Sequence, residues 1–97
     1  MKSIEYLVEI LSEEKLIHVG RVIHFYPRIS VAIVELSAPL SVGDKIVIKG
    51  ASTNFEQIVE SMQIQHKNVE RAEAGQLIGL KVNQRVREKD IVYKKIS

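Results

Sequence analysis

The fold is decided by the stretch Leu36-Ser-Ala-Pro-Leu-Ser-Val-Gly-Asp-Lys-Ile-Val-Ile-Lys-Gly50. Its Gly43-Asp44 pair is a turn signal, and Ile46 and Ile48 then fall on one face of the strand that follows. The same turn-then-strand pattern recurs in weaker form before Leu77–Val82 and before Ile91–Ile96. We therefore expect a β-barrel built from such returns of the chain.

Alternation of apolar and polar residues predicts six strands. They are expected at residues 16–26, 29–36, 45–49, 55–65, 76–84 and 90–96. The fourth is the least regular, because Glu60 interrupts the face formed by Ile58, Met62 and Ile64, and a bulge is expected there. A helical spacing competes for the same residues. Six short strands between glycine-containing turns favour a sandwich or a small barrel, and a closed barrel removes every exposed sheet edge.

Residues 1–14 form a separate helical extension in this interpretation, and residues 15–97 form the barrel. Ile4, Leu7, Val8 and Leu11 are spaced like one face of a helix, for which Ser3 is the N-cap. A strand interpretation of the same segment stays open. Because a helix of three turns is marginally stable alone, its apolar side chains are expected to contact one end of the barrel, a protein partner or a second copy in a homodimer.

Three further apolar residues are expected on the outside of the barrel. Val31 and Ile33 share the outward face of their strand with Glu35, and Val47 faces outward on the next strand. A contiguous apolar patch on a protein surface is commonly a contact site. We therefore expect the N-terminal helix or a partner to cover these positions.

The composition is that of one ordinary globular domain. The chain has 97 residues, and 14 basic against 12 acidic side chains give a net charge of +2. It has no cysteine, which excludes disulfides and thiolate metal sites and fits a cytoplasmic location. No apolar run approaches the roughly 20 residues that span a bilayer. The start of the chain does not resemble a signal peptide, so we expect no membrane association.

No group of residues carries a recognisable catalytic or metal-binding pattern. His18 and His24 could share a strand face, but nothing in the sequence supplies a third metal ligand. The carboxylates show no paired arrangement, and Asp44 and Asp90 are expected to bond to their own turn backbones. We therefore predict no enzymatic activity in the isolated chain, no metal and no cofactor.

Basic and aromatic residues are the strongest candidates for a binding site. His24, Tyr26 and Arg28 surround the first predicted turn, whereas Lys67, Arg85 and Arg87 fall in later loops. Arginine and lysine contact phosphates, and an aromatic ring can stack on an unpaired base, so this set predicts contacts with RNA. An ordinary solvated surface is the alternative.

Particular segments carry a family resemblance. Val19–Val22, Val42–Ile46, Val59–Met62 and Ala74–Leu80 resemble the second domain of translational GTPases such as elongation factor Tu. A closer likeness runs through His24–Leu36, Thr53–Gln57, Val59–Ile64, Val86–Glu88 and Val92–Lys94. These segments are similar to small stand-alone elongation-factor-Tu-like barrels of prokaryotes. They are also similar to the C-terminal barrel of collagenase-like peptidases, a family linked to tRNA hydroxylation.

The resemblance implies an all-β fold: a six-stranded closed antiparallel Greek-key barrel, the translation-protein barrel, with a short N-terminal helix. It also implies a non-catalytic RNA-binding or translation-associated module, with tRNA or rRNA as its partner. A protein-interaction module, or an accessory module for a separate RNA-modifying enzyme, is the alternative. The chain lacks the phosphate-binding loop of a GTPase. Lys89 stands where the family has a turn glycine, so that turn either avoids a positive φ or is strained.

Overall fold

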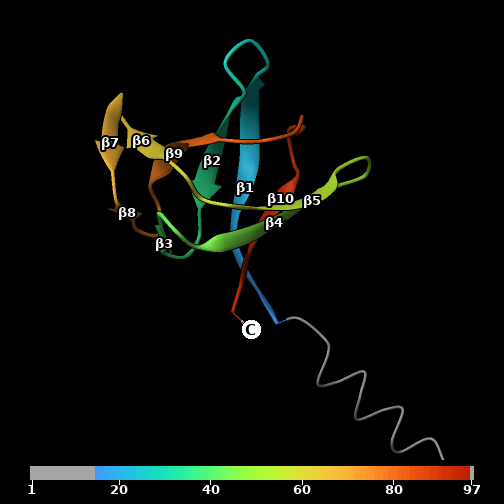
Figure 1. Cartoon of the computed structure of the whole chain (residues 1–97), viewed down its shortest axis with the longest axis horizontal. Coiled ribbons are helices and arrows are strands. Elements are labelled where there is room, and N and C mark those ends of the chain that lie inside the picture. The colour runs from blue at the N-terminus through green and yellow to red at the C-terminus, as the bar shows by residue number, and fades with distance from the viewer. Residues whose placement is uncertain (1–14, 97) are drawn as a thin grey trace, which may run out of the picture.

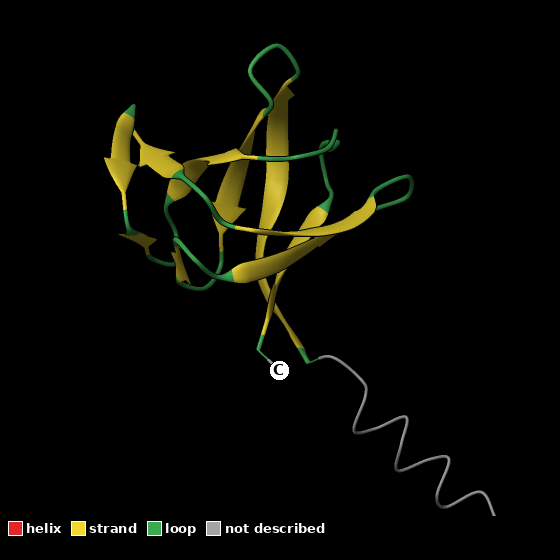
Figure 2. Ribbon diagram, viewed as in Figure 1, coloured by secondary structure: helices red, strands yellow, loops and turns green. Residues whose placement is uncertain are grey.

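Residues 15–96 are described by the computed structural model, and every regular element in this part of the chain is a β-strand (Figures 1 and 2). The strands are β1 (Leu16–Tyr26), β2 (Val31–Leu36), β3 (Leu40–Ser41), β4 (Lys45–Lys49), β5 (Asn54–Ile58), β6 (Met62–Ile64), β7 (Lys67–Val69), β8 (Arg71–Ala72), β9 (Leu77–Lys81) and β10 (Ile91–Lys95). The helix predicted within residues 1–14, with its contact residues Ile4, Leu7, Val8 and Leu11, lies outside the described residues. A bond from Ile96 N to Lys15 O, 3.0 Å long, joins the two ends of the described chain.

Eight of the strands form one antiparallel sheet. Their order is β5-β4-β10-β1-β2-β9-β6-β7, and β3 pairs with β8 in a second, two-stranded sheet. The predicted six-stranded closed barrel is therefore wrong. The large sheet is strongly curved in Figure 1, but its pairing ends at β5 on one side and at β7 on the other.

The difference arises in the segment that was predicted as one strand at residues 55–65. It is interrupted at residues 59–61, so that β5 pairs with β4 whereas β6 pairs with β9. The interruption also shifts the alternation of inward and outward residues by one position, because Val59 and Met62 are both buried. The predicted common face of Ile58 and Met62 is wrong for this reason, and Ile58 is 51% exposed.

Side-chain hydrogen bonds replace backbone pairing beside this interruption. The buried amide of Gln57 donates to the Lys81 carbonyl at 2.9 Å and accepts from the Asn83 backbone N–H at 2.7 Å. Two backbone bonds, from Gly43 N to Val59 O and from Val59 N to Asp44 O, are both 2.8 Å long. They hold the interrupted segment against the turn at residues 41–44, the central turn. One glutamine therefore attaches β5 to the far end of β9, although the two strands are not neighbours in the sheet.

The hydrophobic core fills the inside of the curved sheet. β1 supplies Val19 and Val22, and register shifts between His18 and Gly20 and between Val22 and His24 let both valines face inward. The first of these shifts ends at Gly20. The small sheet adds Leu40 and Ala72, both completely buried, and so closes one side of the core. The remaining buried hydrophobic residues include Ala32, Val34, Leu36, Ile46, Ile48, Phe55, Val59, Met62, Ile78, Leu80, Val82, Val86 and Val92.

Three turns with the same hydrogen-bonding pattern reverse the direction of the chain, at the places where the sequence predicted a turn followed by a strand. They span residues 41–44, 73–76 and 87–90, and the third residue of each has a positive φ: Gly43 at 95°, Gly75 at 90° and Lys89 at 78°. The side chain of the fourth residue accepts a bond from the first backbone N–H. These bonds are Ser41 N to Asp44 Oδ2 at 2.8 Å, Glu73 N to Gln76 Oε1 at 2.7 Å and Arg87 N to Asp90 Oδ2 at 2.8 Å.

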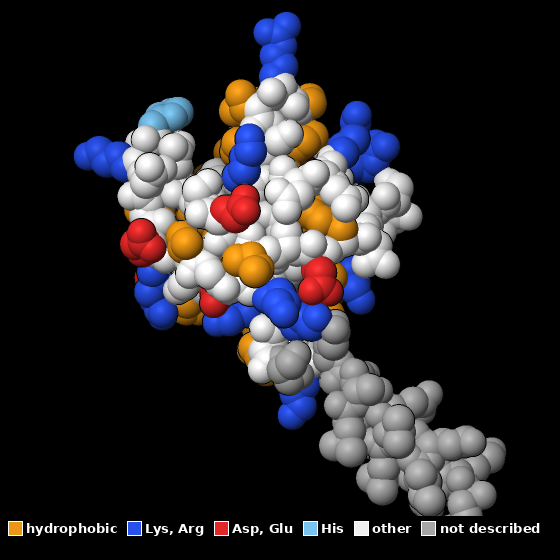
Figure 3. All heavy atoms as spheres, in the orientation of Figure 1, with side chains coloured by type: hydrophobic (Ala, Val, Ile, Leu, Met, Phe, Trp, Pro, Cys, Tyr) orange, Lys and Arg blue, Asp and Glu red, His pale blue; other side chains and the backbone are white. Residues whose placement is uncertain are grey.

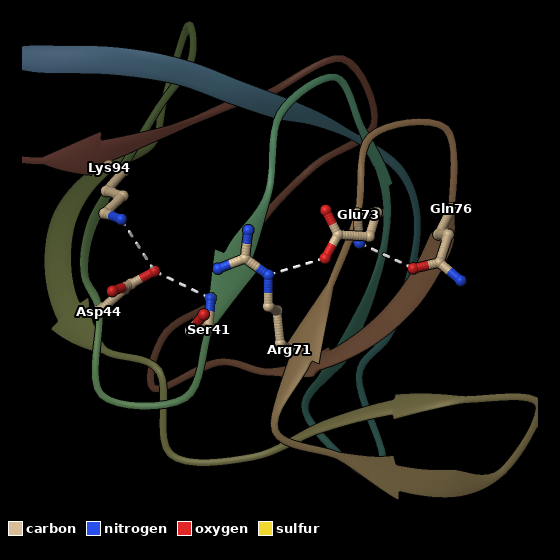
Figure 4. Close-up of polar contacts among 6 residues, drawn as sticks. All are labelled: Ser41, Asp44, Arg71, Glu73, Gln76 and Lys94. Atoms are coloured by element: carbon tan, nitrogen blue, oxygen red, sulfur yellow. Dashed lines mark hydrogen bonds and ion pairs between the residues drawn. The ribbon is translucent and has the colours of Figure 1, made fainter.

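Figure 4 shows the first two of these turns beside one another. Asp44 also forms an ion pair with Lys94 of β10 at 3.4 Å, and Arg71 donates to Glu73 at 2.7 Å. That bond and the charge of Glu73 raise the pKa of the Arg71 guanidinium above its ordinary value. The predicted bonding of Asp44 and Asp90 to their own turns is confirmed, and Lys89 adopts the strained conformation that the sequence left open.

Candidate functional site

An open groove of about 590 Å³ lies on the outer surface between two hairpin turns. One turn joins β1 to β2, the other joins β6 to β7, and Figure 3 shows the surface hollowed between these two projections. The lining residues are Tyr26, Ile29, Val31, Ile33, Gln63, Ile64, Gln65, His66, Gln76, Leu77, Ile78 and Gly79. Volumes of this size are typical of binding sites.

The floor of the groove is formed by outward residues of β2 and β9. Val31 and Ile33 are both half-buried there, in agreement with the expectation that they need cover. Gly79 lies opposite Ile33 in the sheet, and a Cβ atom added to it would meet Val31 Cγ1 at 3.5 Å and the Gln63 carbonyl oxygen at 4.0 Å. Val47 is not part of this surface. It is 6% exposed, between Tyr93 of β10 and Glu56 of β5, so it is covered, and it belongs neither to the groove nor to the core cluster.

Exposed apolar side chains form the rim of the groove. Tyr26 is 47% exposed, Ile29 57% and Leu77 51%. They come from separate parts of the chain, the β1–β2 turn and β9. Isolated exposed hydrophobic residues are common on proteins, but a group that rims an apolar hollow marks a contact surface.

The β1–β2 turn is fixed against β9 by two hydrogen bonds. Lys81 Nζ donates to the Ile29 carbonyl at 3.0 Å, and Val82 N donates to the Ser30 carbonyl at 2.9 Å. These bonds connect the turn directly to the strand that supplies Leu77 and Gly79. This wall of the groove is therefore held in place in the free domain.

Backbone strain is concentrated at the groove. In residues 15–96, four non-glycine residues have a positive φ: Ser30 at 53°, Gln65 at 51°, His66 at 66° and Lys89 at 78°. The first three lie in the two turns that bound the groove. Two consecutive left-handed residues at a tight hairpin turn are normally asparagine and glycine, so Gln65-His66 is a costly choice. Strain of this kind is retained mostly where a surface is used.

Basic side chains flank the groove at its two turns, whereas Glu35, which lies opposite Leu77 in the sheet, pairs with Arg21 at 3.3 Å. No aspartate or glutamate is among the lining residues, and Arg28 and Lys67, both exposed, directly adjoin lining residues in the two turns. The amide side chains of Gln63, Gln65 and Gln76 add neutral donors and acceptors. A complementary ligand would carry apolar groups with acidic groups beside them.

The six residues predicted to bind nucleic acid do not form one surface. His24 and Tyr26 of β1 pack edge to face with ring centroids 4.4 Å apart, and Arg28 follows them in the turn. Lys67 lies on β7 across the groove, so the structure brings Tyr26, Arg28 and Lys67 to the edges of one groove. Arg85 lines a different hollow beside residues 50–55, and Arg87 begins the third turn.

Several lysine and arginine side chains pair with carboxylates. Arg21 pairs with Glu35, Arg71 with Glu73, Lys94 with Asp44 and Lys95 with Glu56, and the His24 ring lies 3.6 Å from Glu88. Binding to a phosphate backbone relies on lysine and arginine side chains that are available to phosphates. The lysine and arginine side chains in these pairs are not among the six residues predicted to bind RNA.

Among residues 15–96, His18 and Ser37 have the geometry of a base beside a nucleophile. His18 Nδ1 lies 3.0 Å from Ser37 Oγ, in a shallow hollow with Arg21 and Gly75. Backbone N–H groups aimed into this hollow are one common means of stabilising an oxyanion. The amides of Ser37 and Gly75 instead donate to the Val19 and Leu36 carbonyls, both at 2.8 Å. Within residues 15–96 no cluster of histidine and carboxylate side chains could hold a metal ion.

Sequence reasoning found part of the groove and missed the rest. Val31 and Ile33 were recognisable as apolar residues on an outward face, and Tyr26 as an aromatic residue beside a turn. Ile29, Leu77 and His66 were missed as a group, because they come together only when β9 and the β6–β7 hairpin lie beside β2. The one available signal was Gly79, since glycine in a paired strand often marks a close approach by a ligand.

Two curated relatives of this chain are named as a protease and a collagenase. The chain is 48% identical over 83 residues to an uncharacterized protease of Methanocaldococcus jannaschii, a match that covers 84% of this chain and 20% of that protein. It is 39% identical over 80 residues to a collagenase of Porphyromonas gingivalis, with 80% of this chain and 19% of the collagenase covered. The chain thus spans about a fifth of the length of these relatives. No protein-family model matches it.

Solved structures agree in fold. The C-terminal domain of a Geobacillus thermoleovorans protein assigned to the U32 peptidases superposes with a TM-score of 0.77 at 21% identity, over 81% of this chain and 92% of that domain. Its selenomethionine variant gives a TM-score of 0.75 at 20% identity, over 78% of this chain and 96% of that one. No helix in residues 15–96 is long and apolar enough to cross a membrane.

These comparisons correct the predicted function. A translation-associated or RNA-binding module is contradicted, because the relatives are named as proteases and collagenases. Of the two resemblances seen in the sequence, the one to collagenase-like peptidases is supported and the one to elongation factor Tu is not. In sequence the chain is related to a segment that makes up about one fifth of a protease and of a collagenase. In fold it matches the C-terminal domain of a protein assigned to the U32 peptidases.

Proposed function

We propose that this chain is a non-catalytic domain that associates with a peptidase-type catalytic part, carried either on the same longer polypeptide or on a separate one. The observation that carries the proposal is the extent of the matches. The protease and the collagenase contain this domain as about a fifth of their length, so about four fifths of each lies outside it. A domain of this kind would bind the catalytic part, and the catalytic part would carry out the reaction.

The polar side chains of the domain support a non-catalytic role. The Ser37 and Gly75 amides beside the His18–Ser37 pair donate to other carbonyls, and the buried polar groups Gln57 and Asp90 are bonded within the fold. Their contacts serve the sheet and the third turn rather than a cleft. A cysteine-free sequence supports a cytoplasmic setting for the domain.

The test has two arms. The purified chain is incubated with gelatin and with a fluorogenic casein, and no hydrolysis above that of a His18→Ala variant is expected. The chain is then titrated against the four fifths of the M. jannaschii relative that lie outside the match, and micromolar or tighter binding is expected. An unrelated protease of similar size serves as the control partner. Hydrolysis that disappears in the His18→Ala variant would overturn the non-catalytic role.

A further inference from the structure

We infer that the groove between the β1–β2 and β6–β7 turns is the surface on which the catalytic part of the peptidase-type protein docks, through a segment with apolar side chains framed by carboxylates. This inference rests on the proposed function and adds to it the place of contact and the chemistry of the partner.

The apolar character of the groove supports a protein segment as its occupant. Tyr26, Ile29 and Leu77 are about half exposed around a floor of Val31 and Ile33, so a seated segment would remove apolar surface from water on both sides. Interface centres are enriched in aromatic and aliphatic residues of this kind and depleted of charge.

Gly79 supports close approach to the floor. Its backbone does not have a positive φ, and an added Cβ would meet Val31 Cγ1 at 3.5 Å and the Gln63 carbonyl oxygen at 4.0 Å, both ordinary van der Waals distances. Neither backbone conformation nor packing within the domain therefore requires glycine at this position. A partner lying on the strand does, because any side chain here would project into the groove.

Charge identifies the partner further. The groove has no carboxylate among its lining residues, while Arg28 and Lys67 stand beside its two walls. Carboxylates on the partner would meet these cations at the edge of the contact. Such pairs at an interface rim affect the association rate and its salt dependence more than they affect the affinity.

The experiment uses the full 97-residue chain fused, through a linker with a unique cleavage site, to the part of the M. jannaschii relative outside the match. After cleavage, co-elution of the two pieces in gel filtration is the expected result for the natural sequence, and calorimetry gives the affinity. Leu77→Asp and Gly79→Ala should each weaken binding at least tenfold. Ile58→Asp is the matched control, because Ile58 is as exposed as Leu77 but lies on β5, at the opposite end of the sheet.

Gly79→Ala separates docking from folding. The methyl group fits the folded domain and replaces glycine within a strand, so the melting temperature should stay unchanged or rise while binding falls. A double variant, Arg28→Glu with Lys67→Glu, should also weaken binding and abolish most of its salt dependence. Binding that does not change with salt in the natural sequence would overturn the acidic character of the partner.

The outcomes distinguish this inference from the proposed function. Co-elution with affinities that Leu77→Asp and Gly79→Ala leave unchanged would overturn the groove and leave the proposed function standing. Separation of the natural pieces would overturn the proposed function and the occupant together. Self-association of the chain that Leu77→Asp abolishes would make a second copy the occupant instead. In the uncleaved fusion, hydrogen exchange at residues 76–79 should be slower than in the free chain, and equal exchange would overturn the groove even if the cleaved pieces precipitate.

Discussion

Lys89 and Gly43 hold the same place in two turns of the same design, with φ values of 78° and 95°. In both turns the next residue is an aspartate whose Oδ2 accepts a 2.8 Å bond from the backbone N–H three residues earlier. Glycine adopts this φ freely, whereas a lysine side chain is strained by it. The fold therefore tolerates at Lys89 a positive φ, whereas the two equivalent turns have glycine at the same position.

Lys89→Gly should stabilise the domain by roughly 0.5–1 kcal/mol, because relief of strain in the folded state exceeds the added freedom of the unfolded chain. Urea unfolding followed by circular dichroism measures the change. Glu88→Gly in the same turn is the control, since residue 88 does not have a positive φ and should gain nothing. A loss of stability in Lys89→Gly would contradict the strain.

Asp44→Ala should destabilise the domain by about 1–2 kcal/mol, because the variant loses the bond from Ser41 N that closes the central turn. Asp44→Asn keeps an acceptor for that bond and loses only the ion pair with Lys94. The Lys94 side chain is partly exposed. Asp44→Asn should therefore cost less than about 1 kcal/mol. Equal losses in the two variants would mean that the ion pair, and not the turn, is the stabilising contact.

Gln57→Leu should destabilise by about 2–4 kcal/mol, because it leaves the Asn83 amide and the Lys81 carbonyl without the partners that attach β5 to the end of β9. Hydrogen exchange at Asn83 gives a local measurement and should accelerate by more than tenfold. Gln63→Leu is the comparison, since Gln63 bonds only to the exposed Asn68 side chain, at 3.1 Å. Retained protection at Asn83 would contradict the bridge.

Replacing Gln65-His66 by Asn-Gly should stabilise the β6–β7 hairpin by about 1 kcal/mol or more, because both residues then suit their left-handed conformation. Thermal unfolding measures this gain. The same change removes two side chains from the groove wall, so binding to the peptidase part should weaken while stability rises. An increase in both stability and binding affinity would contradict a role of the strained turn in binding.

The sequence predicted the local elements well and the closure of the sheet poorly. β1 occupies residues 16–26, as expected, and all three predicted returns are present. Glu60 correctly marked an irregularity, but no local pattern says that the two halves of a strand will pair with β4 and with β9. Strands of two or three residues, such as β3, β7 and β8, are too short to show an alternation at all.

The groove was only partly predictable for a related reason. Val31 and Ile33 could be recognised because both lie in one strand with a clear outward face. Leu77 and Ile29 look like unremarkable exposed residues until the sheet order brings their segments together. The left-handed turn at Gln65-His66 has no glycine or asparagine to announce it.

The central claim is tested most directly by nuclear magnetic resonance of the ¹⁵N-labelled chain, recorded with and without the peptidase part of the M. jannaschii relative. We predict that the amide shifts that change will concentrate at residues 26–33, 63–66 and 76–79, with the β4–β5 end of the sheet unaffected. Changes confined to β4 and β5, or an unchanged spectrum in the presence of a folded peptidase part, would contradict docking at the groove.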